Sequence, residues 1–486
     1  MMSVKRTHIL ASGRRGIPAF LAVLALAGAA AALQAQAPNP TSATNPFFGS
    51  VTAAKATGDT LKLSLDEAVR RGLENNLGLK EAENSEKYVR AERMEAVQNF
   101  LPNISLTGST GLYQHNLAAL GFGPGALKEL AQMSTAKVSS ITRDDLTQGQ
   151  ITYGQMLFSG PVIAAYKAAG AAEKAAYFGR MSARGEVVQQ VATAYLHAIA
   201  AASEVDNAKA LEAEDRLLFS QVHDAHVAGT VSNLDELRAR VQLQAQQQVL
   251  IGAENALEKD LILLKREIGI DPGQKIALTD PAPYSDLATQ TPEEVRAVAY
   301  RSRQDYQSLQ AQVLELKAVR LAYKSQRLPS LSFGGYYGMS LVNGAGTRGN
   351  FVAQGSLTFP LFREARIRGD VEASQANLDA VSAELADLKG NIDKQVRTAL
   401  MDVDATTQLV QVARSNVELA TRALSDETDR VNAGVDDNLP LVTAQATLAA
   451  AQSNLVESLY QFNEAKLVLA RAAGVLETQY RDYLGR

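Results

Sequence analysis

The chain has 486 residues, a net charge of −4 and a pI near 5.9, and 46% of its residues are hydrophobic. The slightly acidic balance argues against a nucleic-acid partner, for which a basic surface would be expected. Cysteine is absent, which excludes a disulfide framework, a cysteine metal site and an N-terminal cysteine that carries a lipid.

The first 37 residues are typical of a secretory signal peptide. Basic residues precede an apolar run from Ile17 to Leu33, and the cleavage signature Ala35-Gln36-Ala37 follows it. We therefore predict a signal peptide over 1–37 and an exported mature chain. An uncleaved membrane anchor is the alternative, although the run is short and rich in alanine for a spanning helix. No comparable apolar run follows, so no membrane-spanning helix is expected in the mature chain.

The first half of the mature chain is predicted to contain long helices and two strands. Ser64 and Glu67 have the spacing of a capping box, and beyond Pro102 the apolar residues alternate with period two, as in a strand. No proline follows Pro161 before Val227, and a single helix there would be about 100 Å long. In chain order, we expect a linker over 38–63, a helix over 64–100 with a break near 75–76, a strand over 103–113, a loop over 114–147, a strand over 150–158, and helices over 161–227 and 233–268.

The second half repeats this plan. Thr291 opens a helix as Ser64 does, and Pro329 ends it as Pro102 does, since 291 − 64 and 329 − 102 both equal 227. Such constant spacing indicates an internal duplication. We expect a first repeat over 64–280 and a second over 281–486, the latter with a helix over 291–327, strands over 330–341 and 351–359, a helix over 364–432, and a final helix that ends at 473.

Four amphipathic strands in one chain require assembly. A sheet in lipid must close so that no backbone edge is exposed, and known barrels have at least eight strands. Two chains would give only this minimum, whose lumen is filled by side chains, so three chains and twelve strands are expected. Two solvated β-hairpins are the alternative. Aromatic residues at or near the strand ends would form interfacial girdles: Tyr113, Tyr153, Phe158, Phe333, Tyr336, Tyr337, Phe351 and Phe359.

The twofold order of capped helix, Leu-Pro strand, short strand and helical hairpin resembles the TolC family of outer-membrane efflux channels. Leu157-Phe158 and Pro360-Leu361-Phe362 close the second strand of each half. The resemblance covers both halves and implies a mainly α fold with a small transmembrane β portion. It implies a homotrimer in outer-membrane lipid, with a twelve-stranded barrel continued by a twelve-helix tunnel through the periplasm.

The same resemblance implies function and partners. The trimer would conduct substrates passively, as the exit duct of a tripartite efflux pump or a type I secretion system. A periplasmic adaptor and an inner-membrane transporter would be its partners. The adaptor is expected at the Gly-centred hairpin tips, Ala228, Gly229, Thr230, Ala433, Gly434 and Val435. Alternatively, each tip glycine only ends a helix, and the two roles are compatible.

A periplasmic gate is also implied by the resemblance. Relatives often place aspartates six and nine positions after the second tip glycine, where this chain has Pro440 and Thr443. Asp436 and Asp437 are the nearest carboxylates. They are predicted either to form a threefold acidic ring that attracts cations or to be solvated charges at a helix start.

Two further motifs resemble a dinucleotide-binding site and a metal site, but the residues around them argue against both. Gly344 to Gly349 form a literal G-x-G-x-x-G, but a strand is expected after it where a dinucleotide site needs a helix. His223 and His226 are adjacent on one helix face, yet such pairs more often belong to a polar surface than to a metal site. We predict no catalytic site, cofactor or metal. The alternative function is a periplasmic coiled-coil structural or adaptor protein without a membrane barrel; an enzyme would rest on the glycine motif alone.

Overall fold

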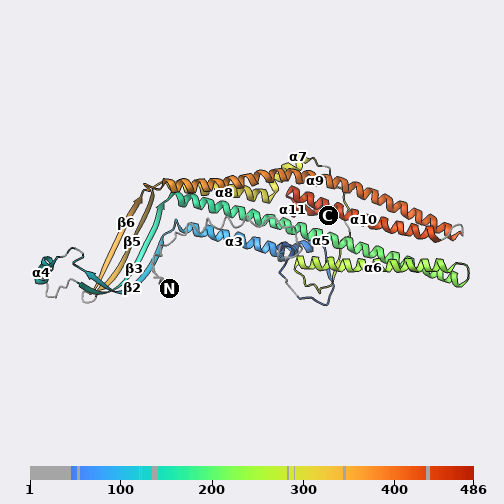
Figure 1. Ribbon diagram of the computed structural model, residues 1–486, viewed down its shortest axis with the longest axis horizontal. Helices are drawn as coiled ribbons and strands as arrows, with labels where there is room; N and C mark the ends of the chain where they lie inside the picture. Colours follow the sequence, from blue (N-terminus) through green and yellow to red (C-terminus); the bar gives the residue numbers. More distant parts are fainter. Residues whose placement is uncertain are drawn as a thin grey trace, which may run out of the picture.

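The computed structural model describes residues 45–51, 55–119, 121, 123–133, 141–281, 284–288, 290–342, 346–433 and 438–485. The molecule is elongated: a sheet lies at one end, the tip of the α5–α6 hairpin and the end of α9 lie at the other, and long helices connect them (Figure 1). The predicted signal peptide lies outside the described residues. No helix among the described residues is both long and apolar enough to cross a membrane.

Both halves contain the order strand, two helices, two strands, two helices, which confirms the predicted duplicated fold. The first half contains η3 (Pro46–Phe48), β1 (Leu61–Leu63), α2 (Leu65–Asn75), α3 (Leu77–Gln98), β2 (Asn103–Asn116), α4 (Pro124–Met133), β3 (Ile141–Phe158), α5 (Gly160–Val227) and α6 (Asn233–Ile268). The second half contains β4 (Ile276–Leu278), α7 (Pro292–Ser302), α8 (Gln304–Ser325), β5 (Ser330–Val342), β6 (Gly346–Thr358), α9 (Glu364–Asn432), α10 (Asn438–Ala473) and α11 (Leu476–Leu484). Among the described residues, η3 and α4 are additions to the first half, and α11 is an addition to the second.

The predicted break between α2 and α3 is confirmed, and its cause is a capping asparagine. Asn76 has extended backbone angles, and its side chain accepts a hydrogen bond from the Leu79 N–H at 3.3 Å. The uninterrupted helix predicted over 291–327 is wrong, because Arg303 is extended between α7 and α8. Its guanidinium donates to Asp305 at 2.6 Å and to Gln395 of α9 at 2.5 Å. These contacts hold Arg303 out of the helix.

Several short or terminal elements differ from the sequence-based expectation. The loop predicted over 114–147 is wrong in part, because β2 continues to Asn116, α4 follows, and β3 begins at Ile141. β1 lies in the predicted linker over 38–63, and β4 lies near the end of the predicted first repeat, where no strand was expected. The two strands pair in parallel, with Leu61 opposite Ile276. Strands of three residues are too short to show a periodicity.

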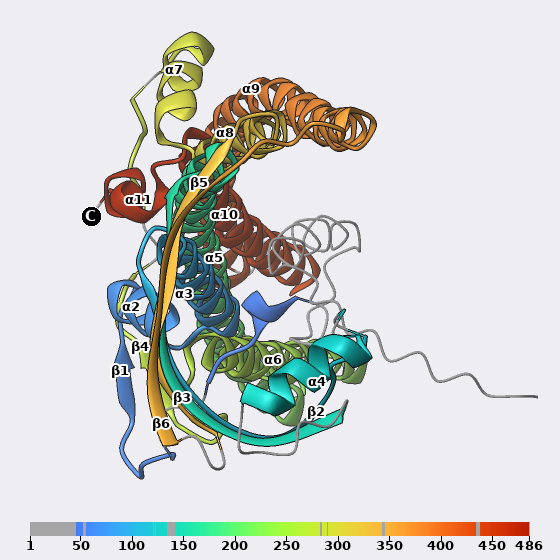
Figure 2. The same cartoon turned by 90° about the vertical axis from the view of Figure 1, so that its left-hand side faces the viewer.

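The sheet and the long helices have the same lateral order. The antiparallel sheet runs β2-β3-β5-β6, and the helices pack in the order α3, α5, α8, α9. Viewed from the sheet end, they form one curved layer (Figure 2). Because each half supplies two neighbouring strands and two neighbouring helices, duplication has produced a layer with one edge in each half.

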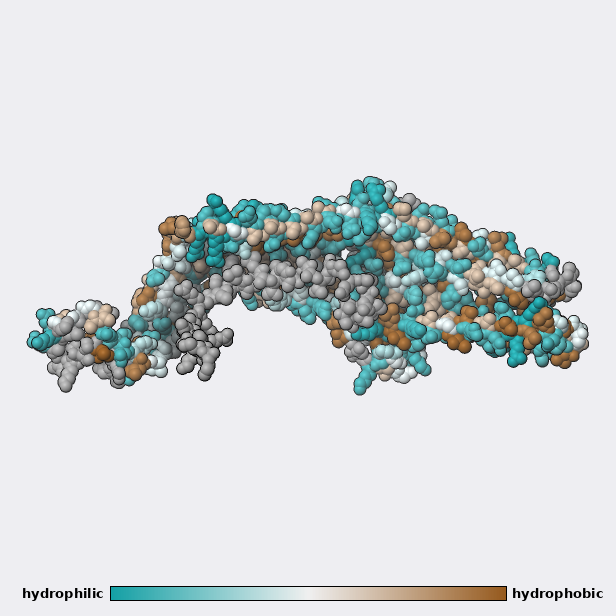
Figure 3. All heavy atoms as spheres, in the orientation of Figure 1, coloured by the Kyte–Doolittle hydropathy of each residue, from teal (hydrophilic) through white to brown (hydrophobic). Residues whose placement is uncertain are grey.

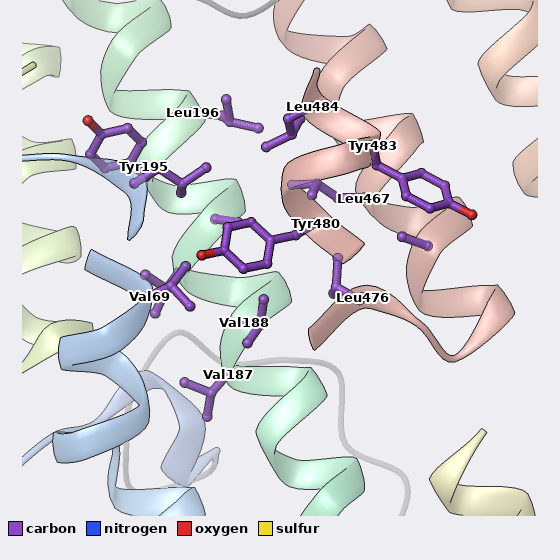
Figure 4. Close-up of a cluster of buried hydrophobic side chains, with 14 of the residues drawn as sticks. Val69, Val187, Val188, Tyr195, Leu196, Leu467, Leu476, Tyr480, Tyr483 and Leu484 are labelled. Carbon is purple, nitrogen blue, oxygen red and sulfur yellow. The ribbon is translucent and has the colours of Figure 1, made fainter. Parts of the chain in front are cut away.

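The main core lies midway along the helices. Here α2, α7, α11 and the β1–β4 pair surround α5 and α10, and buried side chains such as Val187, Val188, Leu467 and Leu476 meet between them (Figure 4). Tyr195 of α5 is fully buried, and its hydroxyl lies 2.9 Å from both the Leu63 carbonyl oxygen and Asp280 Oδ2.

Asp280 connects the two halves at this point. Its Oδ2 atom also accepts a hydrogen bond from the Leu65 N–H at 2.7 Å, in the first turn of α2. A residue from the segment after β4 therefore satisfies a free backbone donor at a helix start in the first half. Together with the β1–β4 pairing, this contact ties the segment between the halves to the core.

Glu267 is the most strongly perturbed acid in this core. Its side chain is 1% exposed, and its Oε2 atom has no hydrogen-bond partner. Burial raises the pKa of Glu267 to about 8, and a hydrogen bond with Gln190 offsets this only in part. The folded protein therefore holds this carboxyl group protonated at neutral pH.

The raised pKa predicts a pH-dependent loss of stability. As pH rises from about 4.5 to about 8, the unfolded chain releases this proton before the folded chain does, so stability falls with pH by up to a few kcal/mol. Glu267→Gln removes the ionisable group and with it this pH dependence. Its melting temperature should exceed that of the wild type, and the difference should grow as pH rises from about 4.5 to about 8. Glu254→Gln, on the exposed side of α6, is the control and should follow the wild type. A constant margin for Glu267→Gln would contradict the assignment.

Candidate functional site

The four-stranded sheet has one apolar and one mostly polar face. Paired residues of neighbouring strands share a face, so the register assigns each side chain: Leu106 lies opposite Ile151, Ile151 opposite Tyr337, and Tyr337 opposite Phe351. The same face holds Ile104, Leu112, Tyr153, Leu331, Phe333, Met339, Leu341 and Leu357.

The opposite face is mostly polar. It carries Asn103, Ser105, Thr107, Ser109, Gln148, Gln150, Thr152, Ser332, Ser340, Arg348, Asn350, Gln354 and Ser356. Tyr113 and Tyr336 also belong to it, so their predicted place in a lipid-facing girdle is wrong. Tyr153 and Phe333, by contrast, lie on the apolar face, with ring centroids 6.0 Å apart.

The apolar face is exposed and has the height of a membrane. Leu106 is 79% exposed, and none of the described helices covers this face. From Leu331 to Leu341, a rise of about 3.3 Å per residue and a tilt of about 40° give a band about 25 Å tall, as in outer-membrane barrels. An exposed apolar face of this size would be unstable in water.

Both edges of the sheet are open. Within the described chain, β2 pairs only with β3, and β6 pairs only with β5. Because the four strands alternate in direction, β2 and β6 run in opposite directions. The β6 edge of one copy can therefore continue, antiparallel, into the β2 edge of another.

The first predicted hairpin tip lies at the opposite end of the molecule. Gly229 has a φ of +76°, and its N–H donates to the His226 carbonyl oxygen at 2.9 Å. The Thr230 hydroxyl donates to the Ala225 carbonyl oxygen at 2.9 Å, and Ser232 caps the start of α6. Gly229 thus ends α5 in the left-handed conformation typical of a helix C-cap. A role in docking stays a prediction.

Two histidines lie next to this tip. His223 Nδ1 lies 2.8 Å from one carboxylate oxygen of Glu236, and His226 Nε2 lies 3.5 Å from the other. Glu236 belongs to α6, so these contacts join the two helices of the hairpin. Among the described residues, no group of three or more potential ligands is arranged to hold a metal ion.

Apolar residues also hold the two hairpins together near their tips. Leu218 and Val222 of α5, Ala239 of α6 and Leu441 of α10 form one buried cluster. Apolar surface is visible over this end of the hairpin (Figure 3). The exposed apolar residues near the tip are Leu217, Val227, Leu234, Leu237 and Val241.

The second tip is described only in part. Ala433 follows α9, whereas Gly434, Val435, Asp436 and Asp437 lie outside the described residues. Pro440 is half-buried in the first turn of α10, and Thr443 is exposed one turn later. The predicted gate therefore stays a prediction.

A comparison with protein families identifies the family of this chain. The family described as outer membrane efflux protein matches residues 68–269 and 298–475, which include both long hairpins and all four strands of the sheet. The chain belongs to the outer membrane efflux protein family. It is an outer-membrane exit channel for efflux that extends into the periplasm, and it is not an enzyme.

Individual relatives of this family member are distant. The pyoverdine export outer membrane protein OpmQ of Pseudomonas aeruginosa is 23% identical over 68% of this chain and 70% of its own length. Among solved structures, a membrane protein from Pseudomonas aeruginosa has a TM-score of 0.70 and 19% identity, covering 87% of this chain and 98% of that one. The Campylobacter jejuni CmeC outer membrane channel has a TM-score of 0.68 and 16% identity, covering 91% and 94%. These structures share the fold.

The sequence did not predict the Asp280 contact in the core or the apolar cluster that joins the hairpins near their tips. The Asp280 contact joins residues 215 positions apart. The tip cluster joins α5 and α10, more than 200 positions apart. Single side chains at such separations carry no periodic signal. The four exposed strands, by contrast, were visible in the alternation of apolar and polar residues.

The two faces of the sheet predict opposite responses to charge. Leu106→Arg places a charge on the apolar face and should cost about 2–4 kcal/mol in a membrane. Thr107→Arg, the next residue on the same strand, points to the polar face and should assemble as the wild type does. The measurement is the amount of each variant in washed outer membranes. Equal amounts of both variants would contradict the assignment of faces.

Proposed function

We propose that three copies of this chain form one continuous exit duct. Three copies of the four-stranded sheet give a closed twelve-stranded barrel, in which the polar face lines the lumen and the apolar face meets lipid. The single observation that supports this proposal is the pair of open, oppositely directed edges on a sheet with one apolar face. Two chains would leave a lumen too narrow for a conduit.

The long helices continue the same assembly. Because α3, α5, α8 and α9 have the lateral order of the strands above them, closure of the sheet also closes the helical layer into a twelve-helix tunnel. The duct would carry substrates passively from a periplasmic adaptor and an inner-membrane transporter, either in a tripartite efflux pump or in a type I secretion system. A polar lumen favours a water-filled passage for solutes.

The mass of the particle tests this assembly. The mature protein is extracted from outer membranes in mild detergent, and its protein mass is measured by light scattering with correction for bound detergent. We expect three times the mass of the mature chain. A monomer that is stable in both detergent and buffer would show that the strands do not span a membrane.

We further propose that the hairpin tips dock the adaptor. The exposed apolar residues beside Gly229 would supply contact area, and Gly229 itself leaves open space, because an added Cβ would meet no atom within 4 Å. The tip at Gly229 also lies at the end opposite the sheet, where a partner from the inner membrane would approach.

Gly229→Arg tests the tip. The φ of +76° disfavours any side chain, and the arginine would occupy the proposed contact surface, so adaptor capture should fall at least tenfold while the trimer remains. Gly252→Arg is the matched control, since Gly252 is exposed within α6 and has open space around it. Adaptor capture that is equal for the two variants would remove the docking role of this tip.

A further inference from the structure

Exposed apolar side chains lie at both edges of the layer, where the sheet meets the helices. Phe100 and Leu101, between α3 and β2, are 36% and 50% exposed. Leu361 and Phe362, between β6 and α9, are 93% and 101% exposed. We call these four residues the collar. Leu361 and Phe362 belong to the Pro-Leu-Phe motif that the sequence shows, and the proposed duct assigns them no role.

The two parts of the collar lie at the same level of the molecule. Phe100 and Leu101 precede the first residues of β2, and Leu361 and Phe362 follow the last residues of β6. Because β2 and β6 run in opposite directions, the start of β2 and the end of β6 are at the helix-facing end of the sheet. Pairing of β6 with β2 of a neighbouring copy would bring the two parts of the collar together.

The charges below the collar are complementary. Arg366, in the first turn of α9, has a side chain that is 71% exposed, and its Nε atom forms a long ion pair with Asp370 Oδ2 at 3.9 Å. Glu95 is exposed near the end of α3. Arg366 follows Phe362 by four residues, and Glu95 precedes Leu101 by six, so a basic residue lies near the collar on one edge and an acidic residue lies near it on the other.

We propose that the collar is a clasp between neighbouring copies of this chain: Leu361 and Phe362 of one copy pack on Phe100 and Leu101 of the next, with Arg366 beside Glu95 below them. This inference rests on the proposed trimer. The clasp adds apolar burial and an ion pair where the hydrogen-bonded barrel seam ends and the helical seam begins. It thereby selects the register in which the two edges join.

Cross-linking tests the clasp directly, because the chain has no cysteine of its own. The variant Leu101→Cys with Phe362→Cys is treated in membranes with a short bis-maleimide, and the products are separated under denaturing conditions. We expect covalent dimers and trimers in most of the protein. Each single cysteine variant should give only background, because a clasp contact needs both edges.

A matched pair at the same level distinguishes the seam from chance proximity. Leu331→Cys with Phe362→Cys joins β5 to the end of the adjacent β6, so its cross-link should stay within one chain. If this pair gave covalent dimers and trimers in the same amounts as Leu101→Cys with Phe362→Cys, the clasp would be overturned. The particle mass of the variants before cross-linking separates the two proposals. If Leu101→Cys with Phe362→Cys is a trimer but gives no covalent dimers or trimers, the clasp alone is overturned. If it is a monomer, the proposed trimer is overturned as well.

Lipid is the other surface that these apolar residues could meet, and tryptophan fluorescence distinguishes it. The chain has no tryptophan, so Phe362→Trp gives a single reporter. In vesicles with brominated phospholipid, the lipid-facing Leu106→Trp should be strongly quenched, whereas Phe362→Trp in the clasp should retain most of its emission. Quenching of Phe362→Trp equal to that of Leu106→Trp would show that the collar contacts lipid, and it would overturn the clasp.

Exchange of the two charges provides an independent test. Glu95→Arg places two positive charges at the seam and should lower the temperature at which the trimer dissociates in detergent. Adding Arg366→Glu restores opposite charges and should recover most of this loss. Failure of the second substitution to restore the trimer would show that the two side chains do not meet.

Discussion

Backbone hydrogen bonding at the edges of the sheet is the constraint on which this structure depends. In lipid, an unpaired N–H or C=O group costs several kcal/mol, so a sheet with two open edges cannot remain alone. The chain supplies four strands, one third of the number that its proposed barrel needs. The helices below the sheet have the same lateral order as the strands, because each strand is joined directly to the helix beneath it.

Much of the fold was predictable because its elements are long and repetitive. The α5 helix, with 68 residues, and the α9 helix, with 69, contain no proline beyond the first turn. The period-two alternation marked part of each of the four strands of the sheet, although the start of β3 fell in the predicted loop. The split of α7 from α8 was not predictable, since Arg303 leaves the helix through contacts with Asp305 and with Gln395 from α9. The short strands β1 and β4 depend in the same way on distant partners.

Some parts of the candidate site could be predicted from the sequence, and others could not. Alternation indicates which residues of a strand share a face, but the pairing register is needed to place one strand's face against the next. Tyr336 and Tyr337 show this limit, because both looked suitable for a girdle and only Tyr337 lies on the apolar face. At the tips, the sequence marks the helix end through Gly229, whereas the packing of α5 against α10 depends on side chains far apart in the chain.

The open sheet edges also affect how such a protein can reach its membrane. A single chain cannot enter lipid without exposing two rows of backbone groups, so insertion and association become one step. The rate of such a step rises with a high power of the chain concentration, unlike that of a barrel that closes within one chain. Before association, a folded single chain would therefore expose both an apolar face and two open edges.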